Sequence, residues 1–492
     1  MRHFLNPGSM PPRKQKDQRF IFELDTSCFK EQHFQFVVKM FRACCRLRYY
    51  LRLRCTTCNI IILLVLLSGS QVWIWCRRQQ VNPETTDIDE FPMDHVKHGR
   101  ERMAEHIAGL SAYSYQMRPV NCGQVFKGDK EEIKRSSKIG TNSKYYRKYF
   151  LQEFKSCKVI RESSKYIFNV SEEEKQFPIA FSILLYKDFF QVERLLRAIY
   201  RPSNIYCLHI DAKSSKSLHD NIRRLAACFD NVFIASKLED VIYSGFSRLQ
   251  ADLNCMSDLL KTNISWKYFI NLPGQTYPLR TNLELVKILK IYNGSNDIEG
   301  ITGARMLTGR FKYVYKIADV KGKKTLENTY KKKLPPPHNI SIVKGSAYGV
   351  FSRNFVKFVI SDQRVQDFVK WLEDINSPDE YIWATLHHTK LNQHLNTPGG
   401  YKGDPDKKPW LATYAIWKGL APCSGIWVRS ICVFGVGDIP HLIQKKQLFV
   451  NKFYFNLQPV ALNCMEEWFG GTPCYFEQLS SAKDMKLDDN SR

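Results

Sequence analysis

Two adjacent carboxylates, Asp379 and Glu380, stand at the start of an expected helix in the segment NSPDEYIWATL. By local rules Ser377 is the N-cap, Pro378 takes the first helical position and Glu380 completes a capping box. A plain cap does not need two adjacent carboxylates, so a chemical role for Glu380 is the alternative interpretation. The local pattern alone favours the capping role, so the catalytic role needs support from other residues.

Asp211 is a candidate binding residue because it directly follows the apolar run IYCLHI. A carboxylate at the end of such a strand often binds a ribose or a base. Capping of the next helix is an equally good interpretation. The chain has no glycine-rich phosphate loop, so a diphosphate would need cationic side chains. The D-x-D strings at 87–89 and 404–406 do not follow strands, and we expect a metal site at neither.

The elements that must position these residues begin after Phe177. Short β-branched runs alternate with amphipathic segments, as in PIAFSILLY, FQVERLLRAIY, NIYCLHID, LHDNIRRLAACF, NVFIAS and FSRLQADLNCMSDLLK. This alternation predicts an α/β domain with a mostly parallel sheet. Residues 379–388 are expected to be helical, and GIWVRSICVFGVGDIPHLI is expected to be one strand followed by a helix start.

An uncharged run from Asn59 to Cys76 precedes this domain and is close to the length of a membrane helix. Basic residues crowd its upstream side, which favours a cytoplasmic N-terminus. A cleaved signal peptide is the alternative, but the run lies far from the chain start. The expected parts are a cytoplasmic tail (1–57, or shorter with a start at Met40), a transmembrane signal anchor (58–76), a stem (77–120), a luminal domain (121–475) and a disordered C-terminal tail (476–492).

The residues beyond the expected anchor have features of an oxidising compartment. Nine of the 15 cysteines lie there, which predicts disulfides with one thiol left over. No cysteine and histidine spacing in this region suggests zinc. Four N-x-[ST] sequons for N-glycosylation also lie there, at Asn169, Asn263, Asn293 and Asn339.

The net charge of +25 makes nucleic acid the first partner to consider. Beyond the N-terminal region, however, the basic residues are scattered, and no zinc-finger, RRM or helix-turn-helix signal stands out. We therefore expect no nucleic-acid binding. A basic surface equally suits an anionic substrate such as a nucleotide diphosphate.

Seven motifs in order, spanning roughly residues 120–470, resemble the β-1,6-N-acetylglucosaminyltransferases, which make core 2 and I-type branches. They are RLLRAIYRPSNIYCLHID, FIASKLEDVIYSGFSRLQADLNCMSDLL, WKYFINLPGQTYPLRTN, KGSAYGVFSRNFV, SPDEYIWATL, VRSICVFGVGD and LFVNKF. The resemblance implies a GT-A-like fold in a type II Golgi membrane protein with a luminal catalytic domain. It also implies inverting transfer of GlcNAc from UDP-GlcNAc, without a metal or other cofactor. The acceptor would be the 6-hydroxyl of a GalNAc or Gal residue, on O-glycans or poly-N-acetyllactosamine of glycoproteins or glycolipids.

The same resemblance implies roles for individual residues. Glu380 matches the general base, and Ser377 and Asp379 match supports that aim it. Arg429 and Lys452 match a basic pair that neutralises the leaving diphosphate. The other implied roles are uridine binding by Asp211 and acceptor contacts by Tyr243, Glu299 and Arg310.

The resemblance further implies a disulfide framework. The implied pairs are Cys122–Cys464, Cys157–Cys228, Cys207–Cys255 and Cys423–Cys432. Cys474 is left over, either free or intermolecular. The oligomeric state stays open, with a homodimer as one alternative.

The chain also departs from the family pattern. The departures are Pro273 and Thr276 in place of a cysteine and a carboxylate, Tyr186 in place of a histidine, and Leu307 where core 2 enzymes carry a lysine. These changes leave two alternatives open. One is a catalytically degenerate member that binds glycans or partners, and the other is a transferase that uses another UDP-sugar such as UDP-xylose.

Overall fold

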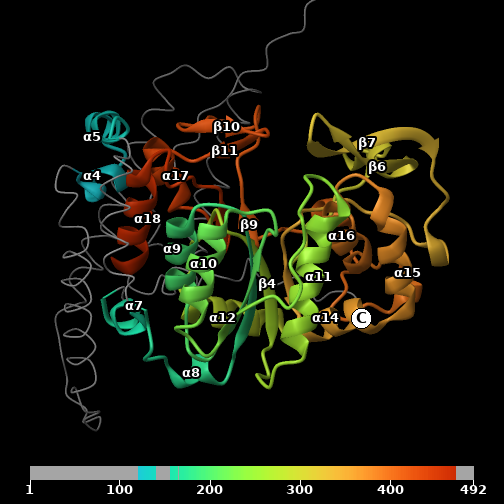
Figure 1. Cartoon of the computed structure of the whole chain (residues 1–492), viewed down its shortest axis with the longest axis horizontal. Helices are drawn as coiled ribbons and strands as arrows, with labels where there is room; N and C mark the ends of the chain where they lie inside the picture. The colour runs from blue at the N-terminus through green and yellow to red at the C-terminus, as the bar shows by residue number, and fades with distance from the viewer. Residues whose placement is uncertain (1–119, 140–155, 164–165, 472–492) are drawn as a thin grey trace, which may run out of the picture. The chain divides into compact units, whose positions relative to one another are not determined.

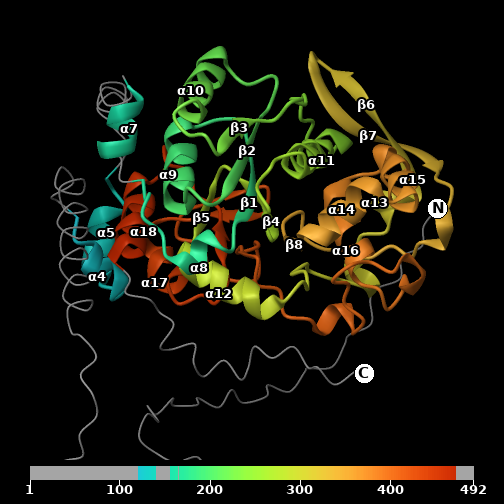
Figure 2. The same cartoon turned by 90° about the horizontal axis from the view of Figure 1, so that it is seen from below.

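The computed structural model describes residues 120–139, 156–163 and 166–471. Its central sheet has five strands in the order β3-β2-β1-β4-β8 (Figure 1; the strands are labelled in Figure 2). They are β1 (Ile179–Leu185), β2 (Ile205–Ile210), β3 (Val232–Ile234), β4 (Tyr268–Pro273) and β8 (Val350–Ser352). The first four run parallel, and β8 is antiparallel to β4. The predicted α/β domain with a mostly parallel sheet is thus confirmed.

Alternate side chains of each strand face two separate hydrophobic cores. In β1, Phe181 and Ile183 belong to one core and Ala180 to the other, as the two-residue period of a strand requires. One core includes residues of α9 (Phe189–Ile199), α10 (Lys216–Ala226) and α12 (Asn282–Tyr292). The other includes residues of α11 (Phe246–Leu260) and α14 (Arg353–Ser361). Both faces of the sheet are therefore covered by helices (Figure 1). We therefore look for a functional site in the loops that connect the strands and helices.

The chain after α12 builds the region around Glu380. A short helix, α13, leads directly into a hairpin of two strands, β6 and β7 (Figure 2). The elements here are η2 (Gly303–Met306), α13 (Gly309–Lys312), β6 (Tyr313–Val320), β7 (Lys323–Lys332), η3 (Pro337–Asn339), α15 (Gln363–Trp371), η4 (Leu372–Asp374), η5 (Pro378–Glu380), α16 (Ile382–His387), η6 (Gln393–Leu395) and η7 (Pro405–Lys407).

The C-terminal part of the domain forms a small sheet and a hairpin. The small sheet has the order β5-β12-β9, with β5 (Thr276–Pro278), β12 (Phe449–Asn451) and β9 (Thr413–Tyr414). The single strand expected in GIWVRSICVF is wrong, because β10 (Ile426–Val428) and β11 (Ile431–Val433) pair as an antiparallel hairpin. Its two turn residues, Arg429 and Ser430, both have a left-handed backbone, with φ values of 53° and 62°.

Four disulfides hold the described segments together. They join Cys122–Cys464, Cys157–Cys228, Cys207–Cys255 and Cys423–Cys432, which are the pairs that the resemblance implies. The first links α4 near the start of the domain to α18 near its end. The remaining elements are α4 (Cys122–Phe126), α5 (Lys130–Ser136), α7 (Cys157–Ser163), α8 (Glu172–Lys175), η8 (Val436–Asp438), α17 (Ile439–Leu442) and α18 (Pro459–Gly471).

Several predictions fall on residues outside the described ranges. These are the cytoplasmic tail, the signal anchor, the stem up to residue 119, the C-terminal tail and Cys474. Within the described ranges, no helix has both the length and the hydrophobicity needed to span a membrane. The four sequon asparagines are described, and all are exposed.

Candidate active site

Glu380 ends the 3-10 turn η5, and the α-helix after it begins only at Ile382. Ser377 has a left-handed backbone, with φ 55° and ψ 55°, and its side chain makes no capping hydrogen bond. Its hydroxyl donates instead to Oδ1 of Asn376, at 2.9 Å. The capping box expected from the local sequence is therefore wrong, and the Glu380 carboxylate has other partners.

Two cations hold the Glu380 carboxylate. Its Oε2 lies 2.7 Å from Nη1 of Arg310 and 3.1 Å from Nζ of Lys344. Arg310 comes from α13, and Lys344 lies in the segment before β8. The next residue, Gly345, donates its N–H to the Glu380 carbonyl at 2.7 Å. Both the backbone and the side chain of Glu380 are therefore fixed by elements far away in the sequence.

Glu299 lies close to this group. Burial raises the pKa of the Glu299 carboxyl, the charge of Lys344 opposes that rise, and the charge of Glu380 adds to it. Two carboxyls with different surroundings thus share one neighbourhood. Such pairs are common where one group handles a proton and the other contacts a substrate.

Asp379, the neighbour of Glu380, faces a buried polar network beneath the turn. Its Oδ2 lies 3.9 Å from Nε of Arg248, whose Nη1 donates to Asp252 at 2.7 Å. Asn271 in β4 also donates to Asp252, at 3.0 Å. Burial raises the pKa of Asp379 to about 6, although the charge of Arg248 lowers it. Through this network the turn that carries Glu380 is attached to α11 and to the central sheet.

A second group of charged residues gathers around Arg429 and Lys452. Arg429 lies at the β10–β11 turn, and Lys452 directly follows β12. Nζ of Lys452 donates to the carbonyl of Val428, at 3.3 Å. Burial, together with the charges of Arg429 and Lys187, lowers the pKa of Lys452 to about 8. Lys187 therefore belongs to this group, although the sequence analysis assigned it no role.

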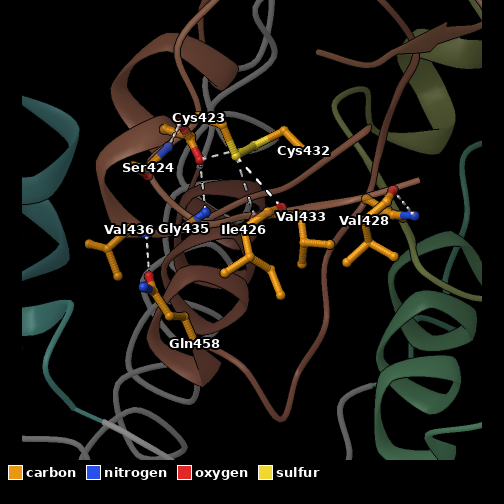
Figure 3. Close-up of a disulfide and its surroundings, with 11 residues drawn as sticks. Cys423, Ser424, Ile426, Val428, Cys432, Val433, Gly435, Val436 and Gln458 are labelled. Atoms are coloured by element: carbon orange, nitrogen blue, oxygen red, sulfur yellow. Dashed lines mark hydrogen bonds between the residues drawn. A yellow bond between two sulfur atoms is a disulfide. The ribbon is translucent and has the colours of Figure 1, made fainter. Parts of the chain in front are cut away.

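The hairpin that presents Arg429 is braced at its open end (Figure 3). The disulfide Cys423–Cys432 links the segment before β10 to β11. Asp438 accepts hydrogen bonds from the N–H groups of Ser424 and Gly435, at 2.9 and 2.8 Å. These contacts limit how far the turn can move relative to the rest of the domain.

Asp211 lies at the carboxyl end of β2, as expected, and is buried. Its carboxylate accepts hydrogen bonds from the N–H groups of Lys213 and Val241, at 3.3 and 3.2 Å, and pairs with Nζ of Lys213 at 3.0 Å. In the nearby loops, Ser214 donates its hydroxyl to the Tyr186 carbonyl at 3.1 Å. Asp211 therefore organises the loops that follow β2 and β3.

Tyr243 and Ser244 connect the two charged groups. Cζ of Arg429 lies 3.7 Å from the centre of the Tyr243 ring. The carbonyl of the next residue, Ser244, accepts the N–H of Ser377 at 2.7 Å. Tyr243 thus contacts Arg429, and the next residue, Ser244, contacts the turn that carries Glu380.

Two sets of residues have the composition of a metal site, and both have other partners. The Sγ atoms of Cys423 and Cys432 lie within 4.8 Å of an Asp438 oxygen, but the two sulfurs form a disulfide and are not thiolates. In the D-x-D string at 404–406, Asp406 accepts hydrogen bonds from Thr302 and Arg305. Asp404 caps η7 through the N–H of Asp406. The other string, at 87–89, lies outside the described residues.

Comparison with known proteins places this arrangement in a family. The model of the Core-2/I-Branching enzymes matches residues 179–443, which is more than half of the chain. The chain belongs to the Core-2/I-branching enzyme family. This is a family of glycosyltransferases, so a nucleotide-sugar donor and a glycan acceptor are the substrates that it implies.

Relatives of this Core-2/I-branching enzyme carry names for one activity. The chain is 38% identical to the human beta-1,3-galactosyl-O-glycosyl-glycoprotein beta-1,6-N-acetylglucosaminyltransferase 3, over 74% of this chain and 85% of the relative. It is 35% identical to a similarly named transferase of Bovine herpesvirus 4 (strain LVR140), over 80% and 91%. A solved structure of 4-diphosphocytidyl-2C-methyl-D-erythritol synthase from Anaerococcus prevotii covers 42% of this chain and 85% of its own at 13% identity. Its TM-score of 0.20 is too low for a conclusion.

In this Core-2/I-branching enzyme the expected catalytic and binding residues other than Asp211 fall into two groups. Glu380, Arg310 and Glu299 lie together, and Arg429, Lys452 and Tyr243 lie together. Tyr243, an expected acceptor contact, lies against Arg429. Sequence reasoning missed Lys344, Arg248 and Lys187. Lys344 opens the motif KGSAYGVFSRNFV, which is the signal that could have drawn attention to it.

Proposed function

We propose that this protein transfers GlcNAc from UDP-GlcNAc to the 6-hydroxyl of a Gal or GalNAc residue, with inversion, and so forms β-1,6 branches. The observation that supports this most strongly is the placement of Glu380. Its carboxylate is held by Arg310 and Lys344, and one short loop connects its turn to the cation at Arg429. The names of the relatives at 35% and 38% identity support the sugar and the linkage.

Glu380 acts as the general base in this proposal. Both cation contacts are with Oε2, so we expect Oε1 to take the proton from the acceptor hydroxyl. As that O–H bond breaks, the acceptor oxygen attacks the anomeric carbon from the side opposite the leaving UDP. The new glycosidic bond forms while the bond from the sugar to the diphosphate breaks, which inverts the anomeric centre.

Arg429 and Lys452 take the charge that develops on the leaving diphosphate. Fixed cations aimed at a developing charge stabilise the transition state more than the ground state. We propose that these side chains serve this purpose without a metal ion. Glu299 and Arg310, which lie beside Glu380, would contact the acceptor sugar, and Asp211 would lie at the uridine.

The proposal includes the setting of the enzyme. The uncharged run at 58–76 would anchor it in the Golgi membrane, with the described domain in the lumen. The exposed sequons and the four disulfides are compatible with such a compartment.

A transfer assay tests the function. The full chain, solubilised from expressing cells, is incubated in EDTA with UDP-GlcNAc or, in a parallel reaction, with UDP-xylose, and is offered Galβ1-3GalNAc and poly-N-acetyllactosamine. We expect a β-1,6-linked product by NMR with at least one acceptor. Transfer from UDP-xylose but not from UDP-GlcNAc would contradict the donor. A folded, UDP-binding protein that transfers neither sugar to any acceptor would favour the degenerate member. A strict requirement for manganese would contradict the metal-free mechanism.

A further inference from the structure

Lys187 lies two residues after β1, at the edge of the sheet where parallel strands bind their ligands. Its Nζ is 3.7 Å from the centre of the Tyr454 ring. Nζ of Lys452 is 5.6 Å from the centre of the same ring. Two ammonium groups therefore share one aromatic neighbour, and Arg429 is close enough for its charge to affect both Lys452 and Tyr454.

Carboxylates in direct ion-pair contact with these three cations are missing from the part of the chain that the structure describes. None of Lys187, Arg429 and Lys452 forms an ion pair with a described carboxylate. The acid next in sequence, Asp188, accepts the N–H of Gln191 and caps α9. Burial raises the pKa of its carboxyl, and the charge of Lys187 opposes that rise without a direct ion pair. Tyr186 and Tyr454 are the aromatic residues beside these cations. Burial raises the pKa of the Tyr454 hydroxyl to about 12, and its interaction with Tyr186 contributes to the rise.

Lys187 and Lys452 are partly buried and Arg429 is exposed. Because the three like charges lie close together, they repel one another. The arrangement becomes favourable when a ligand with several negative charges lies among them. A lysine ammonium is a compact charge with three donors, which suits phosphate oxygens. The geometry thus favours a ligand with at least two acidic groups close together, such as a diphosphate.

We propose that Lys187 is a third cation for the diphosphate of the donor, alongside Arg429 and Lys452. This inference rests on the proposed function for the identity of the donor. The motifs that resemble the family assigned the role only to Arg429 and Lys452. Lys187 reaches the ligand from the loop after β1, whereas the other two come from the C-terminal part of the domain. The diphosphate would therefore be held from two sides.

Lys187 lies with Lys452 and not with the residues around Glu380. The cations around Glu380 are Arg310 and Lys344, and both already contact its carboxylate. Among the described residues Lys187 makes no hydrogen bond or ion pair with that group, and it lies with Lys452 at the Tyr454 ring instead. We therefore expect its loss to affect the donor and not the acceptor.

The test measures ligand binding by calorimetry on the full chain, for the wild type and for Lys187→Met. The probes are UDP, UMP and uridine, which carry the same base and ribose but a decreasing phosphate charge. We expect Lys187→Met to lower the affinity for UDP about tenfold or more, as for loss of a charge-assisted hydrogen bond. The affinity for UMP should fall less, and the affinity for uridine should stay the same as in the wild type. Lys187→Arg should restore most of the UDP affinity.

Lys445→Met is the matched control, because Lys445 also lies over a tyrosine ring, at 4.8 Å from Tyr414. It should leave all three affinities unchanged. Unchanged UDP affinity in Lys187→Met would overturn the inference, and so would equal weakening of UDP and uridine. A melting curve like that of the wild type shows that the variant is folded.

The result separates this inference from the proposed function. Binding is measured without turnover, so a wild type that binds UDP but transfers no GlcNAc would contradict only the function. Active transfer with normal UDP affinity in Lys187→Met would contradict only the role of Lys187. A folded wild type with no affinity for UDP would contradict both.

Discussion

The guanidinium of Arg429 lies over the ring of Tyr243, with Cζ 3.7 Å from the ring centre. The residue after Tyr243 accepts the backbone N–H of Ser377, at the start of the turn that carries Glu380. The two chemical roles of the proposed mechanism, proton removal and charge stabilisation, are thus positioned by consecutive residues. This connection joins segments that lie about fifty to nearly two hundred positions apart along the chain.

The first prediction concerns Tyr243. Its replacement by alanine removes the surface on which Arg429 rests, and a cation–π contact at an exposed site contributes about 0.5–1 kcal/mol. We expect the KM for UDP-GlcNAc to rise about twofold to fivefold, with little change in the KM for the acceptor. Steady-state kinetics with each substrate varied in turn measures both values.

Tyr243→Phe is the control for this prediction, because it keeps the ring and removes only the hydroxyl. It should behave as the wild type toward the donor. If both variants raise the KM for the acceptor and leave that for the donor unchanged, Tyr243 contacts the acceptor, as the resemblance implies.

The second prediction concerns the pH dependence of donor binding. The pKa of Lys452 is lowered to about 8, so the ammonium is charged below that pH and loses its proton above it. Bound diphosphate favours the charged form, so the dissociation constant for UDP-GlcNAc should rise with pH above about 8. UDP-GlcNAc is the better probe than UDP, since it lacks a terminal phosphate that titrates. Calorimetry from neutral pH upward gives the curve.

Lys452→Arg separates this effect from other titrations, because a guanidinium keeps its charge throughout this range. Its curve should stay flat where that of the wild type rises. An identical rise in both proteins would show that a different group is responsible.

The third prediction concerns Asp379 and stability. Its pKa is 3.8 as a free group and about 6 in the folded protein, so the folded state binds more protons between these values. The stabilising contribution of the protonated form is therefore present below about pH 4 and is lost as the pH rises through about 6. Two pKa units correspond to about 3 kcal/mol of the free energy of unfolding.

Asp379→Asn should remove this dependence of the free energy of unfolding on pH. The lost interaction with Arg248 should change the free energy by the same amount at every pH and leave the slope unaffected. Urea unfolding at several pH values measures it in both proteins, with Asp230→Asn as an exposed aspartate control. A slope that persists unchanged in Asp379→Asn would show that other carboxyls cause it.

The sequence predicted the central sheet because its signals are local. Each apolar run such as IYCLHI predicts a strand, and each amphipathic segment between two runs predicts a helix. Helical crossovers between successive strands make the strands parallel. The small sheet β5-β12-β9 has no such signal, since it joins strands around residues 276, 413 and 450. Pairing over these separations depends on the rest of the fold.

The two errors at the site have physical causes. Arg429 and Ser430 adopt a left-handed backbone without the glycine or asparagine that usually marks it, so the hairpin looked like one strand. Ser377 and Glu380 have the right types and spacing for a capping box, but Arg310 and Lys344 take the carboxylate instead. Those partners lie some forty to seventy residues away, beyond the reach of a local pattern.

The role of Glu380 is the central claim, and one comparison tests it most directly. Turnover, UDP affinity and melting temperature are measured for the wild type and for Glu380→Gln, which keeps the shape of the side chain but cannot take a proton. Loss of a general base should lower turnover about 100-fold to 10,000-fold, while UDP binds within about twofold of the wild type and the protein melts normally. Full turnover in Glu380→Gln, with or without a loss of stability, would contradict the account.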